Sequence, residues 1–213
     1  MKTRLQLLRY DIIGLGINLY IPIASTCLCT LVLCLCQTLS SLTVDIVLFL
    51  VNFVLAPMSA WYTILIYQPI FDYEGGELFW VFPQSSLMLG IGRAFIFIFL
   101  YWIEIAVILC ISQFFVRFNE FLPCILRHVP LLSVFYSGLA YLSIVFSKKV
   151  GTPITVVYGY ILICSFLRQR IPDWLNVLVL VETNYASTIM KTLPLAAFIW
   201  LIAQDKLSRY RES

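Results

Sequence analysis

The chain has 213 residues, of which 62% are apolar and 12% are charged. Water-soluble globular domains carry about twice that charged fraction, so the composition excludes a soluble protein and indicates an integral membrane protein. The formal net charge of +3 excludes nothing further, because the distribution of Lys and Arg among the loops is what informs on a membrane protein.

Six apolar stretches are long enough to be considered as membrane spans. A helix needs roughly 20 predominantly apolar residues to cross about 30 Å of hydrocarbon, and charged or turn-rich breaks divide the chain into stretches of about this length. We therefore expect an all-α, polytopic membrane protein that forms one domain over 1–213. The expected spans are 12–36, 42–67, 93–116, 129–147, 150–167 and 186–203.

The segment before the first stretch combines basic residues with Leu5, Leu8 and Ile12 at helical spacing. This pattern is typical of a short helix that lies on an anionic membrane surface; a plain basic flank that sets the topology is the alternative, and both stay open. The following apolar run is about 25 residues long and lacks a small-x-small cleavage signal, so we expect it to remain as the first span.

Four of the seven cysteines fall in the first stretch, at positions 27, 29, 34 and 36. On a helix only the pairs seven residues apart share a face, and these are separated by roughly 10 Å. That distance is too long for a disulfide or a shared metal ion. We interpret the cysteines as packing residues and predict no metal site.

The second stretch contains Asn52 and Pro57, which either face a pathway or pack against a neighbouring helix. Trp61, Tyr62 and Tyr67 follow, and we interpret these rings as an anchor at the membrane interface.

Glu104, in the third stretch, is the carboxylate placed deepest in the expected hydrocarbon region. Ionisable groups cost a few kcal/mol at that depth and are candidates for function by default. The alternative is a protonated or paired residue that serves packing alone.

The segment 168–185 before the last stretch has an apolar core too short to cross the membrane. We expect a re-entrant or interfacial element on the outer side, with Pro172 suited to a helix start. Trp174 in this element is a candidate for pathway or gating together with Asn52 and Glu104.

Basic residues favour one orientation of the chain. With six spans and an inner N-terminus, nine Lys and Arg side chains fall on inner segments and five on outer ones, which predicts that both termini are cytoplasmic. The inner ones are Lys2, Arg4, Arg9, Arg93, Lys148, Lys149, Lys206, Arg209 and Arg211, and the outer ones are Arg117, Arg127, Arg168, Arg170 and Lys191.

Sequence signatures of catalysis are missing. His128 is the single histidine, and no Gly-x-Ser-x-Gly, His-Glu-x-x-His or phosphate-binding Gly-x-x-x-x-Gly-Lys-Ser/Thr pattern occurs. We therefore predict that the chain is not an enzyme and binds no cofactor. Energy for any active transport would come from a partner or an ion gradient.

The loop 68–86 between the second and third stretches carries three of the eleven carboxylates together with several aromatic residues. Gly75 and Gly76 permit a sharp turn between two short helical pieces, and Pro83 marks the break before the next helix. Such a mixture suits docking into a groove of another protein. A solvated loop with its rings at the membrane surface is the alternative.

This loop resembles the corresponding region of ABC-2 type transporter permease subunits. In that family the loop after the second helix has an acid, small residues, Glu, apolar residues and then Pro with a following Ser, and it leads through Gly and a basic residue into the third helix. The matching segments here are 74–79, 83–86 and 90–93.

The resemblance implies a membrane subunit without its own ATPase site. A separate ABC ATPase would bind ATP and Mg, and a second permease subunit, identical or homologous, would complete the pathway in the cell membrane. The coupling helix that contacts the ATPase would comprise Asp72, Glu74, Gly75, Gly76, Glu77, Leu78, Phe79 and Pro83. The resemblance also implies export of a hydrophobic or amphipathic substrate such as a peptide, drug or lipid, with membrane lipid and no nucleic acid among the partners.

Two other classes of function stay open from the sequence. A secondary transporter or channel would need paired intramembrane charges or corresponding broken helices in two halves, and Glu104 is isolated. A non-transporting scaffold or immunity protein is compatible with the same composition.

Overall fold

The computed structural model describes residues 16–71, 87–117, 121–167, 170–172, 174–178 and 185–212. Every regular element within these ranges is helical. Five helical runs are long and apolar enough to cross a membrane. At this level the expected all-α membrane protein is confirmed. The five runs are Gly16–Thr38, Val44–Phe71, Met88–Gln113, Leu122–Ser147 and Tyr185–Tyr210.

The long runs combine α-helix with short segments of other helical types. In chain order the elements are the 3₁₀ turn η1 (Gly16–Leu19), α2 (Tyr20–Thr38), α3 (Val44–Leu50), the π-helical η2 (Val51–Leu55), α4 (Ala56–Phe71), the π-helical η3 (Met88–Gly92), α6 (Arg93–Gln113), α7 (Leu122–Ser147), α8 (Gly151–Phe166) and α9 (Tyr185–Glu212).

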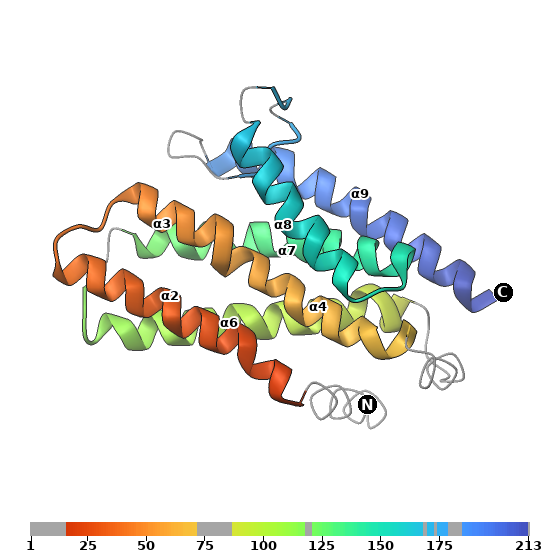
Figure 1. Ribbon diagram of the computed structural model, residues 1–213, viewed down its shortest axis with the longest axis horizontal. Helices are drawn as coiled ribbons and strands as arrows, with labels where there is room; N and C mark the ends of the chain where they lie inside the picture. The colour runs from red at the N-terminus through yellow and green to blue at the C-terminus, as the bar shows by residue number, and fades with distance from the viewer. Residues whose placement is uncertain are drawn as a thin grey trace.

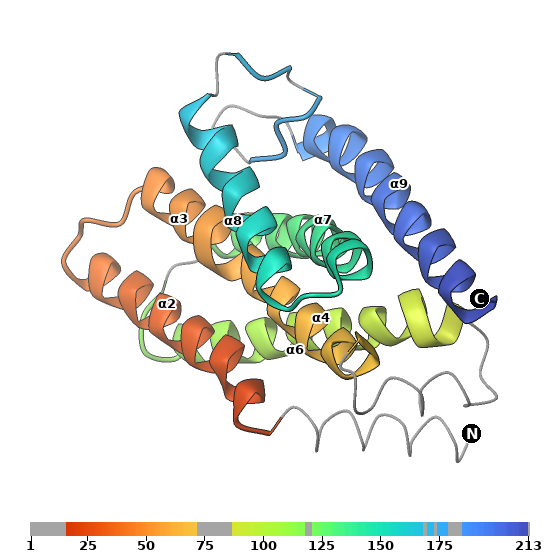
Figure 2. The same ribbon diagram turned by 45° about the vertical axis from the view of Figure 1, so that its right-hand side comes forward.

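The helices run back and forth along the long axis of the bundle, as Figures 1 and 2 show. We call the end at which α4 ends, α6 begins and α7 passes to α8 the proximal end, and it also holds the C-terminal part of α9. The other end, where α2 passes to α3, is the distal end. The two flanks of the loop 72–86 therefore share an end with the last turns of the chain.

Helix α7 forms the centre of the bundle, and it contacts α4, α6, α8 and α9. In its most apolar stretch 72% of the residues are buried, against 28% for the first helical run. Small residues permit this contact: a Cβ added at Gly138 would lie 2.8 Å from Nε1 of Trp200 in α9. The same Trp200 Nε1 donates to the Val134 carbonyl at 2.9 Å.

The expected fifth span, 150–167, corresponds to α8, which has 16 residues. At 1.5 Å per residue this helix is about 24 Å long, shorter than the roughly 30 Å of hydrocarbon. The composition of α8 is apolar, but its length sets it apart from the five longer runs.

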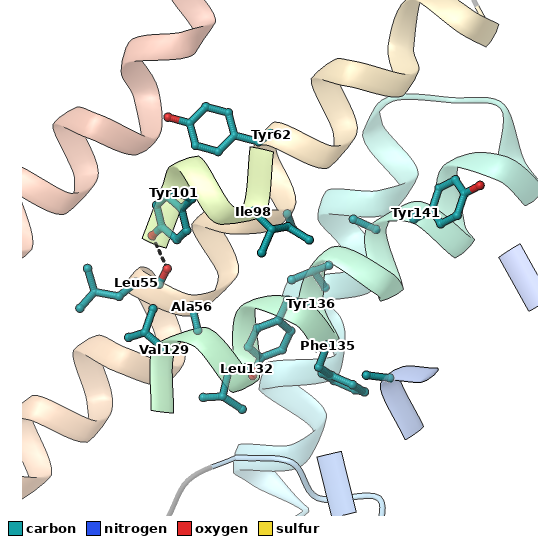
Figure 3. Packing of buried hydrophobic residues seen from close by; sticks show 14 of the residues in the cluster. Leu55, Ala56, Tyr62, Ile98, Tyr101, Val129, Leu132, Phe135, Tyr136 and Tyr141 are labelled. Carbon is teal, nitrogen blue, oxygen red and sulfur yellow. Dashed lines mark hydrogen bonds between the residues drawn. The ribbon is translucent and has the colours of Figure 1, made fainter. Parts of the chain in front are cut away.

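The second helical run changes to a π-helical turn at Val51–Leu55, immediately before Pro57. Proline has no N–H to donate, and its ring collides with the carbonyl four residues earlier, so the preceding turn widens. The hydroxyl of Tyr101 in α6 donates to the Leu55 carbonyl in this widened turn (Figure 3).

Tyr62 and Tyr67 are buried inside the bundle, at 4% and 0% exposure. Their interpretation as an interfacial anchor is therefore wrong, because both rings face neighbouring helices. Tyr62 lies edge to face with Tyr101, with ring centroids 5.9 Å apart, and both are drawn in Figure 3. Tyr67 stacks on Tyr141 of α7 at 4.5 Å.

Candidate functional site

A break in the helix at Gly90 is the most distinctive local feature of the proximal end. Gly90 has φ −87° and ψ −113°, outside the helical range, within η3. Its carbonyl accepts a hydrogen bond from the Tyr67 hydroxyl at 2.6 Å. Tyr67 belongs to the last turns of α4, so this bond joins the end of one helix to the start of the next.

The backbone N–H after the break is also satisfied by a side chain. The Ile91 N–H donates to Oε1 of Gln204 in α9 at 3.1 Å, and the Tyr141 hydroxyl of α7 donates to the same oxygen at 3.0 Å. A buried peptide group without a partner would cost about 1–3 kcal/mol, so Gln204 stabilises a break that the helix itself cannot satisfy.

A side chain at position 90 would displace the Gln204 amide from its place in this cluster. A Cβ there would stand 1.9 Å from Gln204 Oε1 and 2.7 Å from the Tyr141 hydroxyl. We call Tyr67, Gly90, Tyr141 and Gln204 the Gly90 cluster. It connects α4, η3, α7 and α9, and its hydrogen bonds are between uncharged groups.

The Gly90 cluster lies at the base of the loop 72–86. The loop 72–86 starts after Phe71 and ends before Leu87, and the bond from Tyr67 to Gly90 closes the base of that loop. Through Gln204 and Tyr141 the second flank is also connected to α9 and α7.

A second polar cluster lies inside the bundle, around Glu104 of α6. The Tyr62 hydroxyl donates to Glu104 Oε2 at 2.9 Å. The other carboxyl oxygen, Oε1, is buried and has no hydrogen-bond partner among the described residues. Thr26 of α2 is close enough to the carboxyl to interact with it, so α2, α4 and α6 meet at this group. We call Glu104, Tyr62 and Thr26 the Glu104 cluster.

Hydroxyl groups tie α4 and α6 to the central helix α7. Ser137 donates to Ser59 at 3.1 Å, Ser59 reaches the Ser133 carbonyl at 3.1 Å, and Trp102 Nε1 donates to the Ser133 hydroxyl at 2.7 Å. These bonds cross helix interfaces and leave the centre of the bundle closely packed.

The expected outer element lies at the distal end, in the ranges 170–172 and 174–178. Its backbone there consists of turns and bends and forms no helix. The Tyr160 hydroxyl of α8 donates to the Leu175 carbonyl and accepts from the Val177 N–H at 3.2 Å. Val177 is 1% exposed, so one tyrosine and one buried valine fix this segment to α8.

The three candidates for pathway or gating are not gathered at one place. Asn52 is buried at 5% exposure in η2, and Trp174 is 61% exposed on the distal segment. Tyr62, the partner of Glu104, follows Asn52 by ten residues along the same run, which is about 15 Å of helix. Glu104 has a defined polar partner, Tyr62, across a helix interface.

The proposed coupling residues from Asp72 to Pro83 lie outside the described residues, as does the expected surface helix of residues 1–15. The structure describes the two ends from which the loop starts and into which it returns. All seven cysteines fall within the described ranges, and each is a free thiol. No group of three metal-ligating side chains occurs among the described residues.

Sequence reasoning missed Tyr67, Tyr141 and Gln204 as members of a site. The available signal was the presence of polar side chains within apolar helices, since such groups require partners in a membrane. The sequence places Gly90 only in the segment that resembles the permease family, and its close approach to Gln204 of α9 depends on the three-dimensional packing.

Comparisons with protein-family models, with curated proteins and with solved structures found no match for the chain.

Proposed function

We propose that this chain is the membrane-spanning subunit of an ATP-driven transporter, similar to ABC-2 permeases, and that a separate ATPase subunit docks on the loop 72–86. In this proposal α8 serves as a short fifth crossing, both termini face the cytoplasm, and two permease subunits enclose the pathway. The cargo class is a hydrophobic or amphipathic compound that leaves the cell.

The observation that carries the proposal is the connection at the base of the loop. Tyr67 bonds to Gly90 across the two flanks of the loop, and Gln204 and Tyr141 extend the connection to α9 and α7. A partner that moves the loop would move four elements of the bundle together, which is what an ATP-driven permease requires of its coupling element.

The sequence around the loop supports the same function. Acidic and aromatic residues alternate in 71–74 and both types recur up to residue 82, and the pattern of Pro, Ser, Gly and Arg leads into α6. Arg93, at the start of α6, is buried at 3% exposure. An acidic loop offers charge complementarity to a basic groove on a partner.

Charge reversal in the loop tests the proposal. The chain is co-expressed with the ABC ATPase encoded in the adjacent reading frame, and the complex is recovered through a tag on the chain. We expect Glu74→Lys combined with Glu77→Lys to reduce the recovered ATPase at least tenfold, because two attractive charge contacts become repulsive.

The matched control is Asp45→Lys, a charge reversal on an exposed carboxylate in the first turn of α3 at the distal end. This variant should recover as much ATPase as the wild-type chain. Equal recovery of ATPase by the loop variant and the wild type would contradict the coupling assignment, as would the absence of an ABC ATPase gene beside this one.

The Glu104 cluster favours a second candidate, a secondary transporter or channel that works without ATP. The supporting observation is a half-buried carboxyl with one bonded and one unbonded oxygen between α2, α4 and α6. Under this alternative Glu104→Gln would abolish transport in cells that lack the ATPase. If Glu104→Gln leaves transport unchanged at every pH, the second candidate is contradicted and Glu104 serves packing alone.

A further inference from the structure

A groove of about 460 Å³ opens at the proximal end between α7, α8 and α9. It lies beside the last two turns of α7 and the first turns of α8. Its walls are almost entirely apolar, and hydroxyl groups occur at the level of the loop between α7 and α8. The residues that matter for the argument are Leu142, Phe146, Ser147, Thr152, Val156 and Ile202.

Basic side chains stand at the mouth of this groove. The Lys206 ammonium lies 5.7 Å from the centroid of the Phe146 ring, which lines the groove, and 5.1 Å from the Tyr210 ring. The Lys148 ammonium lies over the same Tyr210 ring at 4.3 Å. Tyr210 therefore brings two ammonium groups together by cation–π contacts, and one of them also lies close to the Phe146 ring.

Lys148 is held in place by its backbone as well. It caps α7 in the left-handed conformation, with φ 54°, and its N–H donates to the Ile144 carbonyl at 2.8 Å. Lys149 follows directly, and both side chains are exposed. Three lysines thus gather within one turn of the apolar groove.

No described carboxylate neutralises this basic rim. Asp205 is the acidic residue whose side chain is described at the proximal end, and its carboxylate is bonded to Arg209 at 2.8 Å. The rim keeps a positive charge next to an apolar cavity, and it lies where α7 and α8 reach the polar edge of the bundle.

We propose that this groove binds an anionic phospholipid, with an acyl chain along Phe146, Val156 and Ile202 and the phosphate among Lys148, Lys149 and Lys206. Basic pockets between membrane helices bind anionic headgroups in this way. A free phosphate would gain nothing from the apolar walls, and a neutral lipid would gain nothing from the lysines. The combination selects a ligand that has both parts.

Competition between two lipids tests the assignment. The delipidated chain in neutral detergent is mixed with equal amounts of phosphatidylglycerol and phosphatidylcholine with the same acyl chains, and bound lipid is counted by native mass spectrometry. We expect the wild-type chain to bind phosphatidylglycerol at least about fivefold better. Each lysine near an anionic surface strengthens the binding of anionic lipid by roughly this factor.

The triple variant Lys148→Gln, Lys149→Gln and Lys206→Gln should bring this ratio close to one. The single variant Lys206→Arg retains the charge and should keep the preference, which separates the loss of charge from a loss of folding. Lys191→Gln, a charge removed from the distal part of α9, is the matched control and should leave the ratio unchanged.

A second arm tests the groove itself. Val156→Trp fills the cavity with a larger apolar side chain, and we expect it to lower the binding of both lipids while their ratio is kept. An unchanged ratio in the triple variant would overturn the proposal. Displacement of phosphatidylglycerol by an equal concentration of glycerol phosphate would overturn it as well, because the site would then be one for free phosphate.

Discussion

The Gly90 cluster and the Glu104 cluster both place polar groups between helices, but they satisfy these groups differently. In the first, the Tyr67 hydroxyl, the Ile91 N–H and the Tyr141 hydroxyl each donate to an uncharged acceptor, and Gln204 Oε1 receives two of these bonds. In the second, Tyr62 satisfies one oxygen of an ionisable group, and the other oxygen is buried without a partner among the described residues.

This difference indicates different roles. A hydrogen-bonded cluster of neutral groups fixes the relative positions of the helices that it joins. A carboxyl that is only half bonded inside an apolar bundle is costly, and it stays able to bind a proton or a cationic group. Within the proposed function, we assign the coupling to the ATPase to the Gly90 cluster. Glu104 belongs to the second candidate, a transporter or channel that works without ATP.

Gly90→Ala should have the largest effect on stability. The new methyl group displaces Gln204 Oε1, so the bonds from Ile91 and Tyr141 are lost at about 1 kcal/mol each. We expect the free energy of unfolding to fall by about 2 kcal/mol, measured by SDS titration from mixed micelles. Gly92→Ala is the control, since its methyl would come no closer than 3.3 Å to Met88 Sδ and 3.4 Å to the Leu87 carbonyl oxygen. Equal losses in the two variants would contradict the close packing at Gly90.

Tyr67→Phe should have the next largest effect. The ring still stacks on Tyr141, but the Gly90 carbonyl loses its donor in a buried position. The expected loss is about 1.5 kcal/mol, measured by the same titration. Tyr20→Phe removes a hydroxyl from a ring that is 62% exposed, and it should change the stability by less than about 0.5 kcal/mol.

Tyr62→Phe should cost about 1 kcal/mol, because it removes the donor to Glu104. A double-mutant cycle with Glu104→Leu measures the coupling between the two side chains, which should be about 0.5–1 kcal/mol. Strict additivity of the two single effects would show that the hydrogen bond between Tyr62 and Glu104 adds nothing to the free energy of unfolding.

Glu104→Gln should have the smallest effect on stability, within about 0.5 kcal/mol of the wild type, because the amide oxygen still accepts from Tyr62. This variant separates shape from charge, because it keeps the shape of the side chain and removes its ionisation. A loss of more than about 2 kcal/mol would mean that the carboxyl carries a charge with an essential partner.

Much of the fold follows from local pattern, and the exceptions have physical causes. Hydropathy locates the helical runs because each must bury its own backbone groups in lipid. The expected stretch 150–167 agrees with α8 to within one residue at each end, but the hydrogen bonds by which Tyr160 fixes the segment after this helix were not foreseen. Such a tertiary contact leaves no periodic signal in the sequence.

The candidate site was less accessible to prediction. Glu104 stands out in the sequence as an isolated carboxylate. Its partner Tyr62 lies 42 residues away, and the neighbouring aromatic residues predict an interface residue there. Gln204 and Gly90 are separated by more than a hundred residues, and their closeness is a product of helix packing. The coupling residues themselves, from Asp72 to Pro83, stay a prediction.

Site-specific photo-crosslinking in living cells tests most directly whether the loop 72–86 contacts an ABC ATPase. A benzoylphenylalanine replaces Phe79 in the loop or, as the control, Phe114, which is 87% exposed at the distal end. We predict that the Phe79 adduct contains an ABC-type ATPase, identified by mass spectrometry, and that the Phe114 adduct does not. Phe79 adducts that contain lipid alone, or no ATPase, would contradict the proposed contact between the loop and an ABC ATPase.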